Sequence, residues 1–287
     1  MKQIVIISGK GGTGKTVLTA SFASLAKNKV IVDCDVDAAD MHLLLHPAVK
    51  ERFEFRSGQT ARLDKEKCSE CGECIKRCRF DAIDKDFIID PVSCEGCGLC
   101  SHICPCGAIV MEENISGEWF ISDTQYGPLV HARLGIAEDN SGKLVSVVRQ
   151  AAKDIAEKEG KSYILIDGPP GIGCPVIAAI TGTDLAVVVT EPTLSGIHDM
   201  IRITDTTGHF QIPTRVVINK YDLNPDNSDK IMEICSSKSI EIMGKIPFSA
   251  RVPRSLVQAM PFVEFAAEDE VTQEIISIWD KIEEMMQ

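Results

Sequence analysis

Aromatic residues, basic runs and long apolar runs are all scarce in this sequence of 287 residues. Phe, Trp and Tyr make up only 5% of it, which argues against a platform on which single-stranded nucleic acid stacks. The formal net charge is −12, from 30 basic and 42 acidic side chains, and no basic run offsets it. Because nucleic-acid binding requires a positive surface, we expect no nucleic-acid partner.

No stretch of the sequence predicts secretion or membrane insertion. The apolar run at residues 4–7 is too short for a signal peptide, and three prolines interrupt the weakly charged stretch 168–183. In the segment 268–287, Lys281 is the only basic residue, which argues against a basic membrane-binding helix. We therefore expect a cytoplasmic protein whose cysteines bind metal more often than they form disulfides.

Short runs rich in Val and Ile alternate with longer helical patterns. Continuous apolar strands are buried on both faces, so the alternation predicts an α/β fold with a doubly wound, mostly parallel sheet. The predicted strands are residues 3–8, 30–33, 163–167, 185–190, 215–219 and 240–243, and the predicted helices are residues 16–27, 141–157, 195–206, 228–236 and 270–286.

The alternation is lost between residues 58 and 117, and the sheet is expected to resume near residue 118. Eight of the twelve cysteines fall within the 37 residues from Cys68 to Cys104. The sequence therefore predicts one large domain formed by residues 1–57 and 118–287, with a small inserted α+β domain at residues 58–117.

A glycine-rich loop follows the first predicted strand and precedes a helix. Residues 9–16 read G-K-G-G-T-G-K-T, which satisfies the phosphate-binding motif in the context that the motif requires. We expect Lys15 to reach the β- and γ-phosphates and the Thr16 hydroxyl to coordinate Mg²⁺. A glycine-rich turn without a ligand is the alternative. The loop residues whose backbone N–H groups are expected to bind the phosphates are Gly11, Gly12, Thr13 and Gly14.

A second lysine, Lys10, extends this motif to K-G-G-T-G-K-T. Here the sequence resembles the deviant P-loop ATPases, the family of MinD, ParA, Mrp and the nitrogenase iron protein. The resemblance implies ATP and Mg²⁺ as ligands, and it implies that Lys10 reaches the phosphates of a partner chain in a dimer. A homodimer and a heterodimer with a related paralogue both remain open. For Lys10, a solvated loop charge is the alternative.

An acidic loop follows the second predicted strand and is similar to a second motif of the family. By this resemblance Asp35 positions the attacking water. Asp40 stands where related sequences often have Asn, so its role in a nucleotide switch is less defined, and Asp37 is equally well interpreted as a charge at the loop tip.

Two later strands end in residues that also match the family. The run Y-I-L-I-D ends at Asp167, and the resemblance implies that Asp167 holds the Mg²⁺ shell and that the Gly168 amide senses the γ-phosphate. The run V-V-I-N ends at Asn219, which by resemblance hydrogen-bonds adenine. The predicted catalytic residues are therefore Lys10, Lys15, Asp35 and Asp167.

Two cysteine runs have the spacing of a bacterial ferredoxin with two clusters. In that pattern, three closely spaced thiolates bind one [4Fe-4S] cluster and the fourth cysteine of each run binds the other cluster. Zinc ribbons are the alternative, but they require CxxC pairs separated by a longer spacer. The predicted ligand sets are Cys68, Cys71, Cys74 and Cys104 for cluster 1, and Cys94, Cys97, Cys100 and Cys78 for cluster 2.

Four cysteines lie outside these sets. Cys106 is expected to be a bystander, and Cys34 and Cys235 are expected to be small buried side chains. Cys174 has a position similar to that of a cysteine with which the nitrogenase iron protein holds a cluster between subunits, but the second ligand of that pair has no counterpart here. A bridging cluster at Cys174 is thus one hypothesis and a packed thiol is the other. The CxxC with which Mrp-type carriers bind a bridging cluster has no counterpart after Cys106.

Taken together, the motifs resemble ATPases of the MinD/Mrp superfamily that carry an inserted ferredoxin domain. The resemblance implies slow, partner-stimulated ATP hydrolysis that couples a dimer switch to low-potential electron transfer toward a redox partner. An ATP-dependent iron-sulfur cluster carrier or assembly factor for client proteins is the alternative, although the missing CxxC counts against it. A partitioning or regulatory switch whose clusters sense oxygen or redox state is a third hypothesis.

Overall fold

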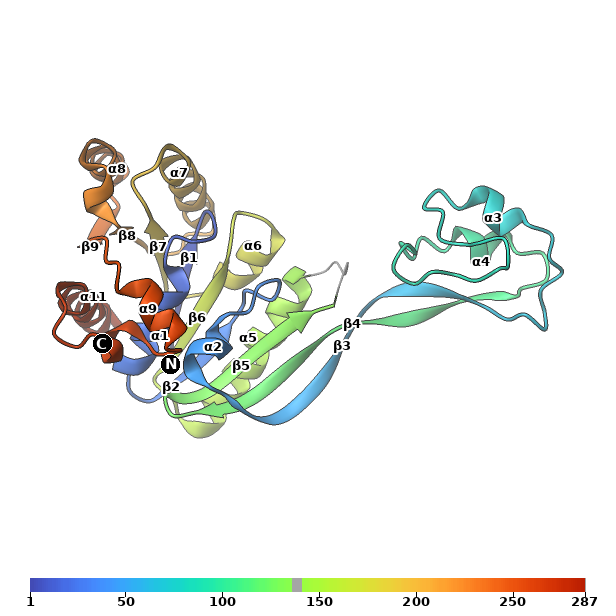
Figure 1. Ribbon diagram of the computed structural model, residues 1–287, viewed down its shortest axis with the longest axis horizontal. Helices are drawn as coiled ribbons and strands as arrows, with labels where there is room; N and C mark the ends of the chain where they lie inside the picture. The colour runs from blue at the N-terminus through green and yellow to red at the C-terminus, as the bar shows by residue number, and fades with distance from the viewer. Residues whose placement is uncertain (136–140, 287) are drawn as a thin grey trace. The chain divides into compact units, whose positions relative to one another are not determined.

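The computed structural model describes residues 1–135 and 141–286 of the chain (Figure 1). Its strands form one nine-stranded sheet in the order β3-β4-β5-β2-β6-β1-β7-β8-β9. The strands are β1 (Lys2–Ser8), β2 (Lys29–Asp33), β3 (Ala48–Leu63), β4 (Ile109–Thr124), β5 (Gly127–Leu134), β6 (Tyr163–Pro170), β7 (Leu185–Thr190), β8 (Thr214–Asn219) and β9 (Glu241–Ile246).

Helices connect most of these strands, as the alternation of the sequence predicts. Helix α1 follows the glycine-rich loop, and α11 packs against α1 on one face of the sheet. The helices are α1 (Lys15–Leu25), α2 (Met41–Leu45), α3 (Glu73–Arg77), α4 (Leu99–Ile103), α5 (Ser141–Glu159), α6 (Cys174–Ile180), α7 (Leu194–His209), α8 (Pro225–Ser237), α9 (Val252–Val257), α10 (Phe262–Phe265) and α11 (Glu270–Met286), with a 3-10 turn η1 at Tyr221–Leu223.

The central strands are parallel. Strand β1 pairs in parallel with β6 and β7, β2 with β5 and β6, and β8 with β7 and β9. The apolar run from Ile4 to Ile7 in β1 is fully buried, because helices cover both faces of the sheet. The predicted α/β fold with a mostly parallel sheet is confirmed. In such a sheet the carboxyl ends of the strands share one edge, where ligands bind.

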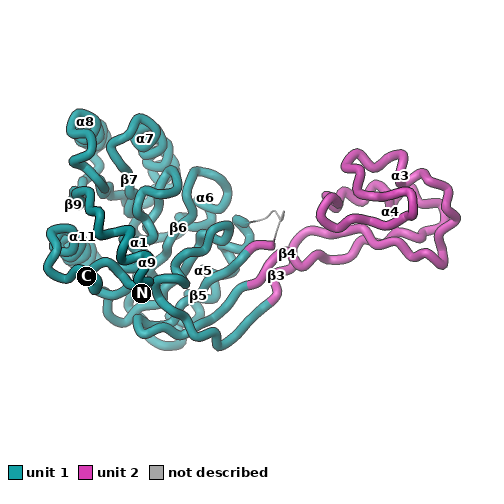
Figure 2. Tube along the Cα trace, viewed as in Figure 1, with its two compact units in different colours: residues 1–53, 119–133, 141–287 teal, residues 54–118, 134–140 magenta. Residues whose placement is uncertain are grey.

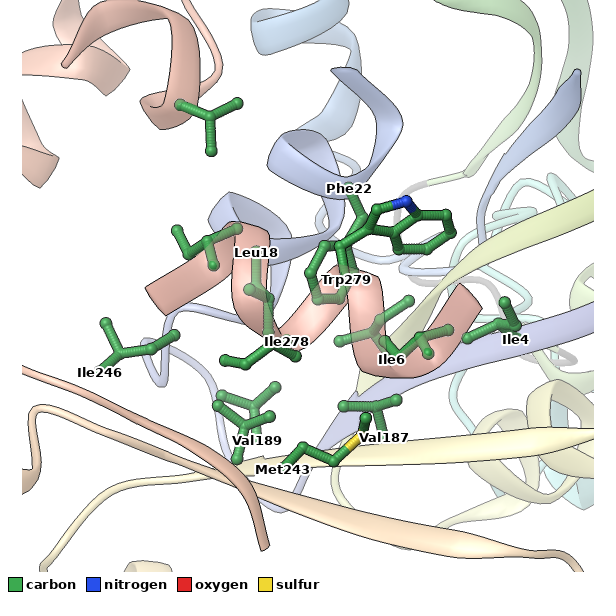
Figure 3. Close-up of a cluster of buried hydrophobic side chains, with 14 of the residues drawn as sticks. Ile4, Ile6, Leu18, Phe22, Val187, Val189, Met243, Ile246, Ile278 and Trp279 are labelled. Atoms are coloured by element: carbon green, nitrogen blue, oxygen red, sulfur yellow. The ribbon is translucent and has the colours of Figure 1, made fainter. Parts of the chain in front are cut away.

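The main hydrophobic core fills the space between the sheet, α1 and α11 (Figure 3). The rings of Phe22 in α1 and Trp279 in α11 lie 5.4 Å apart, and they cover Ile4 and Ile6 of β1. Replacing a buried aromatic side chain with Ala costs about 3–5 kcal/mol, so this core anchors the helix that begins at the glycine-rich loop.

The sheet extends further into the cysteine-rich segment than the sequence predicts. Strand β3 continues to Leu63 and β4 begins at Ile109, whereas the sheet was expected to stop near residue 58 and resume near residue 118. The physical reason is that most side chains of β3 are exposed, and only Phe55, Ser57 and Ala61 are buried along it. Most of its buried and partly buried side chains, Phe53, Phe55, Ser57, Ala61 and Leu63, alternate with exposed ones, so β3 lacks the continuous apolar run by which the other strands were predicted.

The chain divides into two compact units (Figure 2). The first consists of Met1–Phe53, Trp119–Arg133 and the described chain from Ser141 onward. The second is built on Glu54–Glu118 and has its own small core around Ala61, Ile83 and Ile109. It contains the segment 58–117, whose boundaries as an inserted domain stay a prediction. Within the described residues, no helix combines the length and the apolar character needed to span a membrane.

Candidate functional site

The glycine-rich loop joins β1 to α1 at the carboxyl edge of the sheet. Gly12 and Gly14 have φ angles of +79° and +90°, which glycine adopts far more easily than other residues. A Cβ atom on Gly14 would lie 2.4 Å from Nδ2 of Asn219, and that same nitrogen donates a hydrogen bond of 2.7 Å to the carbonyl oxygen of Thr13. The end of β8 therefore holds the loop in place.

Lys15 lies beside carboxylates from two other strands. Its Nζ is 2.9 Å from Oδ2 of Asp167, at β6, and 3.8 Å from Oδ2 of Asp35, after β2. The Thr16 hydroxyl donates to Asp167 Oδ2 over 2.9 Å, and the Thr19 hydroxyl donates to Asp167 Oδ1 over 2.8 Å. The structure thus brings together four residues that the sequence singled out separately, Lys15, Thr16, Asp35 and Asp167.

A third carboxylate, Asp33, belongs to this group and was missing from the predicted site. Asp33 Oδ1 accepts the Asp35 N–H over 3.0 Å, and its Oδ2 accepts the Met41 N–H over 3.2 Å, so it shapes the acidic loop. Its signal in the sequence was a carboxylate at the end of a buried strand, two residues before Asp35.

The carboxylates outnumber the cations at this position. Burial raises the pKa of Asp33 well above its ordinary value, and the charge of Asp167 adds to the effect. Burial also raises the pKa of Asp35 to about 6, although Lys15 opposes the shift. For Lys15, burial favours the neutral form, but the nearby carboxylates outweigh it and the pKa is raised. A divalent cation would offset this excess of negative charge.

The raised pKa of Asp35 predicts that the stability of the folded protein changes with pH. Because the folded pKa of about 6 lies above the ordinary value near 4, the folded state binds more protons between these values, and stability falls as pH rises through that window. Asp35→Asn is therefore expected to stabilise the nucleotide-free protein by about 1–3 kcal/mol at pH 7.5. The gain is expected to vanish near pH 4.

Urea unfolding of both proteins at the two pH values measures this difference. Asp229→Asn is the matched control, because Asp229 is exposed on α8 and its replacement is expected to leave stability unchanged. A loss of stability in Asp35→Asn at pH 7.5, or an equal gain at both pH values, would contradict the assignment of a desolvated carboxylate.

Lys10 is held by its own chain. Its Nζ lies 2.5 Å from Oε1 of Glu191, 3.2 Å from Oγ1 of Thr193 and 3.1 Å from Oγ of Ser195, all around the start of α7. The other oxygen of Glu191 lies 3.1 Å from Nζ of Lys220. Burial works against ionisation of Glu191, but the two lysines outweigh it and lower its pKa. Sequence reasoning missed Glu191, which no motif marks.

A cavity of about 600 Å³ opens beside the loop. One end is polar and contains the loop residues with Lys15, Asp35, Asp40 and Asn219. The other end is apolar and was not predicted from the sequence. Its wall is formed by side chains of α2, of the end of β9, of the segment after β9 and of α9, namely Leu43, Leu44, Ile246, Pro247, Phe248, Val252 and Leu256.

Gly168 is absent from the described residues that line this cavity. A Cβ atom there would lie 2.5 Å from Cγ2 of Ile7 and 2.9 Å from the carbonyl oxygen of Ile6. Close packing of β6 on β1 thus accounts for this glycine, and its predicted contact with the γ-phosphate stays a prediction.

The second unit contains two small cavities, each lined by four of the predicted cluster ligands. Within the described residues, no three His, Cys, Asp or Glu side chains converge closely enough to bind one metal ion. One cavity is lined by Cys68, Cys71, Cys74 and Cys104, together with Cys106, and the other by Cys94, Cys97, Cys100 and Cys78. The fourth cysteine of each run therefore lies with the first three of the other run.

The remaining cysteines belong to the first unit. Cys34 and Cys235 are buried, as expected, and burial raises the pKa of both thiols. Cys174 is exposed at the first residue of α6, and the bridging cluster at this thiol stays a hypothesis.

Three curated proteins resemble different parts of the chain. An uncharacterized protein of Methanocaldococcus jannaschii is 34% identical over 288 residues, which cover 99% of this chain and 97% of that protein. The pyruvate synthase subunit PorD of Methanothermobacter marburgensis is 50% identical over 75 residues, which cover 24% of this chain and 93% of PorD. The indolepyruvate oxidoreductase subunit IorA of the same organism is 45% identical over 58 residues, which cover 19% of this chain and 9% of IorA.

Solved structures of cell-division ATPases share the fold. The MinD ATPase of Pyrococcus furiosus has a TM-score of 0.61 at 19% identity, with 99% of each chain covered. The septum site-determining protein MinD of Pyrococcus horikoshii, solved with Mg-ADP, has a TM-score of 0.61 at 17% identity, with 99% of this chain and 96% of that chain covered. Residues 4–262 match a family model that spans the P-loop, the acidic loop, Asp167 and Asn219. The chain therefore belongs to the CobQ/CobB/MinD/ParA nucleotide binding domain family.

Proposed function

We propose that this protein binds and hydrolyses ATP and uses a nucleotide-driven dimer switch to control low-potential electron transfer through two [4Fe-4S] clusters. One observation carries the proposal: a P-loop site and two cavities, each lined by a complete set of four cysteines, occur in one chain. The redox partner would be a second protein, and the cytoplasm is the compartment in which these thiols would stay reduced.

The proposed ATP site uses the cavity beside the glycine-rich loop. Backbone N–H groups of residues 11–14 would bind the phosphates, and Lys15 would neutralise charge at the β- and γ-phosphates. Thr16 and Asp167 would hold Mg²⁺, and Asp35 would position the attacking water. The excess of carboxylates around Lys15 fits a divalent cation. The Mg-ADP in the MinD of Pyrococcus horikoshii supports the same ligand.

Adenine would occupy the apolar end of this cavity. Asn219 lines the cavity between the loop and that end, and its amide still has one N–H and one lone pair beyond the hydrogen bonds to Thr13 and Lys220. Pro247 and Phe248, which follow β9, would cover the base. Burial of a flat ring there would add to the affinity supplied by the phosphates.

The two cysteine-lined cavities fit iron-sulfur clusters by the chemistry of their donors. Four thiols line each cavity, and a [4Fe-4S] cluster binds each thiolate at a different iron. Such a cluster holds its thiolates farther apart than a single zinc ion does, and no side chains in the described part of the chain converge at single-ion spacing. When bound, the clusters would accept and donate single electrons. Short matches to oxidoreductase subunits support this use.

The sheet offers a physical connection between the two activities. Asp33, the last residue of β2 before the acidic loop, is paired with His131 of β5. Strands β4 and β3 follow β5 in the same sheet, and their chain continues into the second unit. We propose that a shift of the acidic loop on nucleotide binding is passed through these strands.

An anaerobic redox titration monitored by EPR tests the proposal on the iron-loaded full chain. It is carried out without nucleotide, with MgATP and with a non-hydrolysable analogue. We expect two reducible clusters whose midpoint potential shifts by about 60 mV or more with nucleotide, which is a tenfold change in a one-electron equilibrium.

The control is Cys235→Ala, which removes a buried thiol outside both ligand sets and is expected to leave the signals unchanged. Zinc in place of iron would overturn the electron-transfer proposal. Midpoint potentials that stay the same with and without nucleotide would exclude the proposal that nucleotide binding changes the cluster potentials. ATP-dependent loss of iron to an apo-protein acceptor would instead identify a cluster carrier.

A further inference from the structure

The two cysteine runs form an internal repeat, and its halves differ at the second position after the last cysteine of each run. The runs end at Cys78 and Cys104, and two residues later stand Phe80 and Cys106. Each of these side chains lines the cavity that contains the last cysteine of its own run. One cavity therefore has four cysteines and a phenyl ring, whereas the other has five cysteines.

The turn after α4 brings the fifth thiol beside a predicted ligand. Sγ of Cys106 lies 3.7 Å from Sγ of Cys104 and 3.8 Å from Oγ of Ser69. The Gly107 N–H donates to the carbonyl oxygen of Cys104 over 3.2 Å, and the φ angle of Gly107 is +61°. This tight turn folds Cys106 back toward Cys104, and the Cys106 side chain is exposed.

We propose that Cys106 is a reserve ligand that replaces Cys104 at one iron of cluster 1, an inference that rests on the proposed function. In the exchange, the bond from iron to Cys104 sulfur breaks as a bond to Cys106 sulfur forms. Cys106 gives up its thiol proton and the released Cys104 thiolate takes up one, so no electron is transferred. Because the two sulfur atoms lie 3.7 Å apart, side-chain rotation is enough.

The same exchange has no counterpart at cluster 2. The position that corresponds to Cys106 is Phe80, whose ring has no donor atom for iron. Loss or oxidation of Cys104 would therefore leave cluster 1 with four ligands, whereas loss of Cys78 would leave cluster 2 with three. The proposal makes cluster 1 the more persistent of the two when its fourth ligand is damaged.

Two matched alanine variants of the iron-loaded full chain test this difference. Iron and sulfide contents and EPR spin counts are measured after anaerobic reconstitution, and no activity assay is needed. The wild-type chain is expected to hold about eight irons, Cys104→Ala about eight and Cys78→Ala about four. Adding Cys106→Ala to Cys104→Ala is expected to lower the content to about four.

A thiol grafted into the other half extends the test. Phe80→Cys in the Cys78→Ala background is expected to return the iron content toward eight, because the proposal requires only a thiol at this position. The far-UV circular dichroism spectrum and the urea unfolding curve of each variant, compared with those of the wild type, verify that it is folded.

The outcomes separate this inference from the proposed function. A wild-type chain that holds no iron overturns both. A wild-type chain with about eight irons, but a Cys104→Ala variant that loses as much iron as Cys78→Ala, overturns the reserve ligand alone. The reserve ligand is also overturned if Cys104→Ala holds the same amount of iron with and without the added Cys106→Ala substitution. It is likewise overturned if the folded variant with Phe80→Cys and Cys78→Ala holds no more iron than Cys78→Ala alone.

Discussion

Replacing Lys15 with Ala is expected to reduce ATP turnover by about 10²–10³-fold, because the proposed function assigns to Lys15 the charge that would neutralise the transferred phosphate. The same change removes the cation nearest to Asp167 and Asp35. Breaking a buried ion pair by removing one partner costs about 3–5 kcal/mol, so the nucleotide-free protein is also expected to unfold more easily.

Magnesium separates the two effects. We expect added Mg²⁺ to restore part of the lost stability, because it offsets the carboxylates, but not the turnover. Phosphate release and urea unfolding, each with and without Mg²⁺, measure both quantities. Lys27→Ala is the control, since Lys27 is exposed beyond the end of α1 and is expected to change neither. Turnover within a few-fold of the wild type would contradict the proposed role of Lys15.

Replacing Lys10 with Ala is expected to abolish ATP-dependent dimerisation while nucleotide binding is retained. In the structure Lys10 contacts Glu191, Thr193 and Ser195 of its own chain, so it must leave these partners before it reaches another chain. Glu191→Gln removes the negative charge that pairs with Lys10 and so weakens the interaction of Lys10 with its own chain. A charge-assisted hydrogen bond contributes about 1.5–3 kcal/mol, so we expect the dimer of this variant to form at least about tenfold more tightly.

Sedimentation of the variants with a non-hydrolysable ATP analogue measures the dimer. Glu241→Gln is the matched control, because Glu241 forms an exposed ion pair with Arg215 and is expected to leave the dimer unchanged. The proposed release of Lys10 is wrong if Glu191→Gln weakens the dimer or if Lys10→Ala dimerises like the wild type.

Most of the first unit could be predicted from the sequence. Buried parallel strands are continuous apolar runs, so β1, β6, β7 and β8 were found within a few residues of their ends. β3 and β4 were not found in this way, because buried and partly buried side chains of β3 alternate with exposed ones and many residues of β4 are only partly buried, so neither strand is a continuous apolar run.

The candidate site was predicted as separate motifs, and the tertiary structure decided how their charges combine. The residue types at Lys15, Asp35 and Asp167 follow from local motifs, but Asp33 joins them only because the ends of β2 and β6 are adjacent in the sheet. Likewise, Glu191 forms its ion pair with Lys10 because β7 lies next to β1 in the sheet, which places the end of β7 beside the glycine-rich loop.

For the cysteines too, part of the arrangement could be predicted from the sequence and part depends on the tertiary structure. The spacing along the sequence predicted two sets of four cluster ligands, and in the structure the members of each set line one cavity. Spacing could not place Cys106, whose counterpart in the other run is Phe80 and not a cysteine. Only the turn at Gly107 brings its sulfur within 3.7 Å of Cys104, because distances across a turn depend on backbone angles and not on residue order.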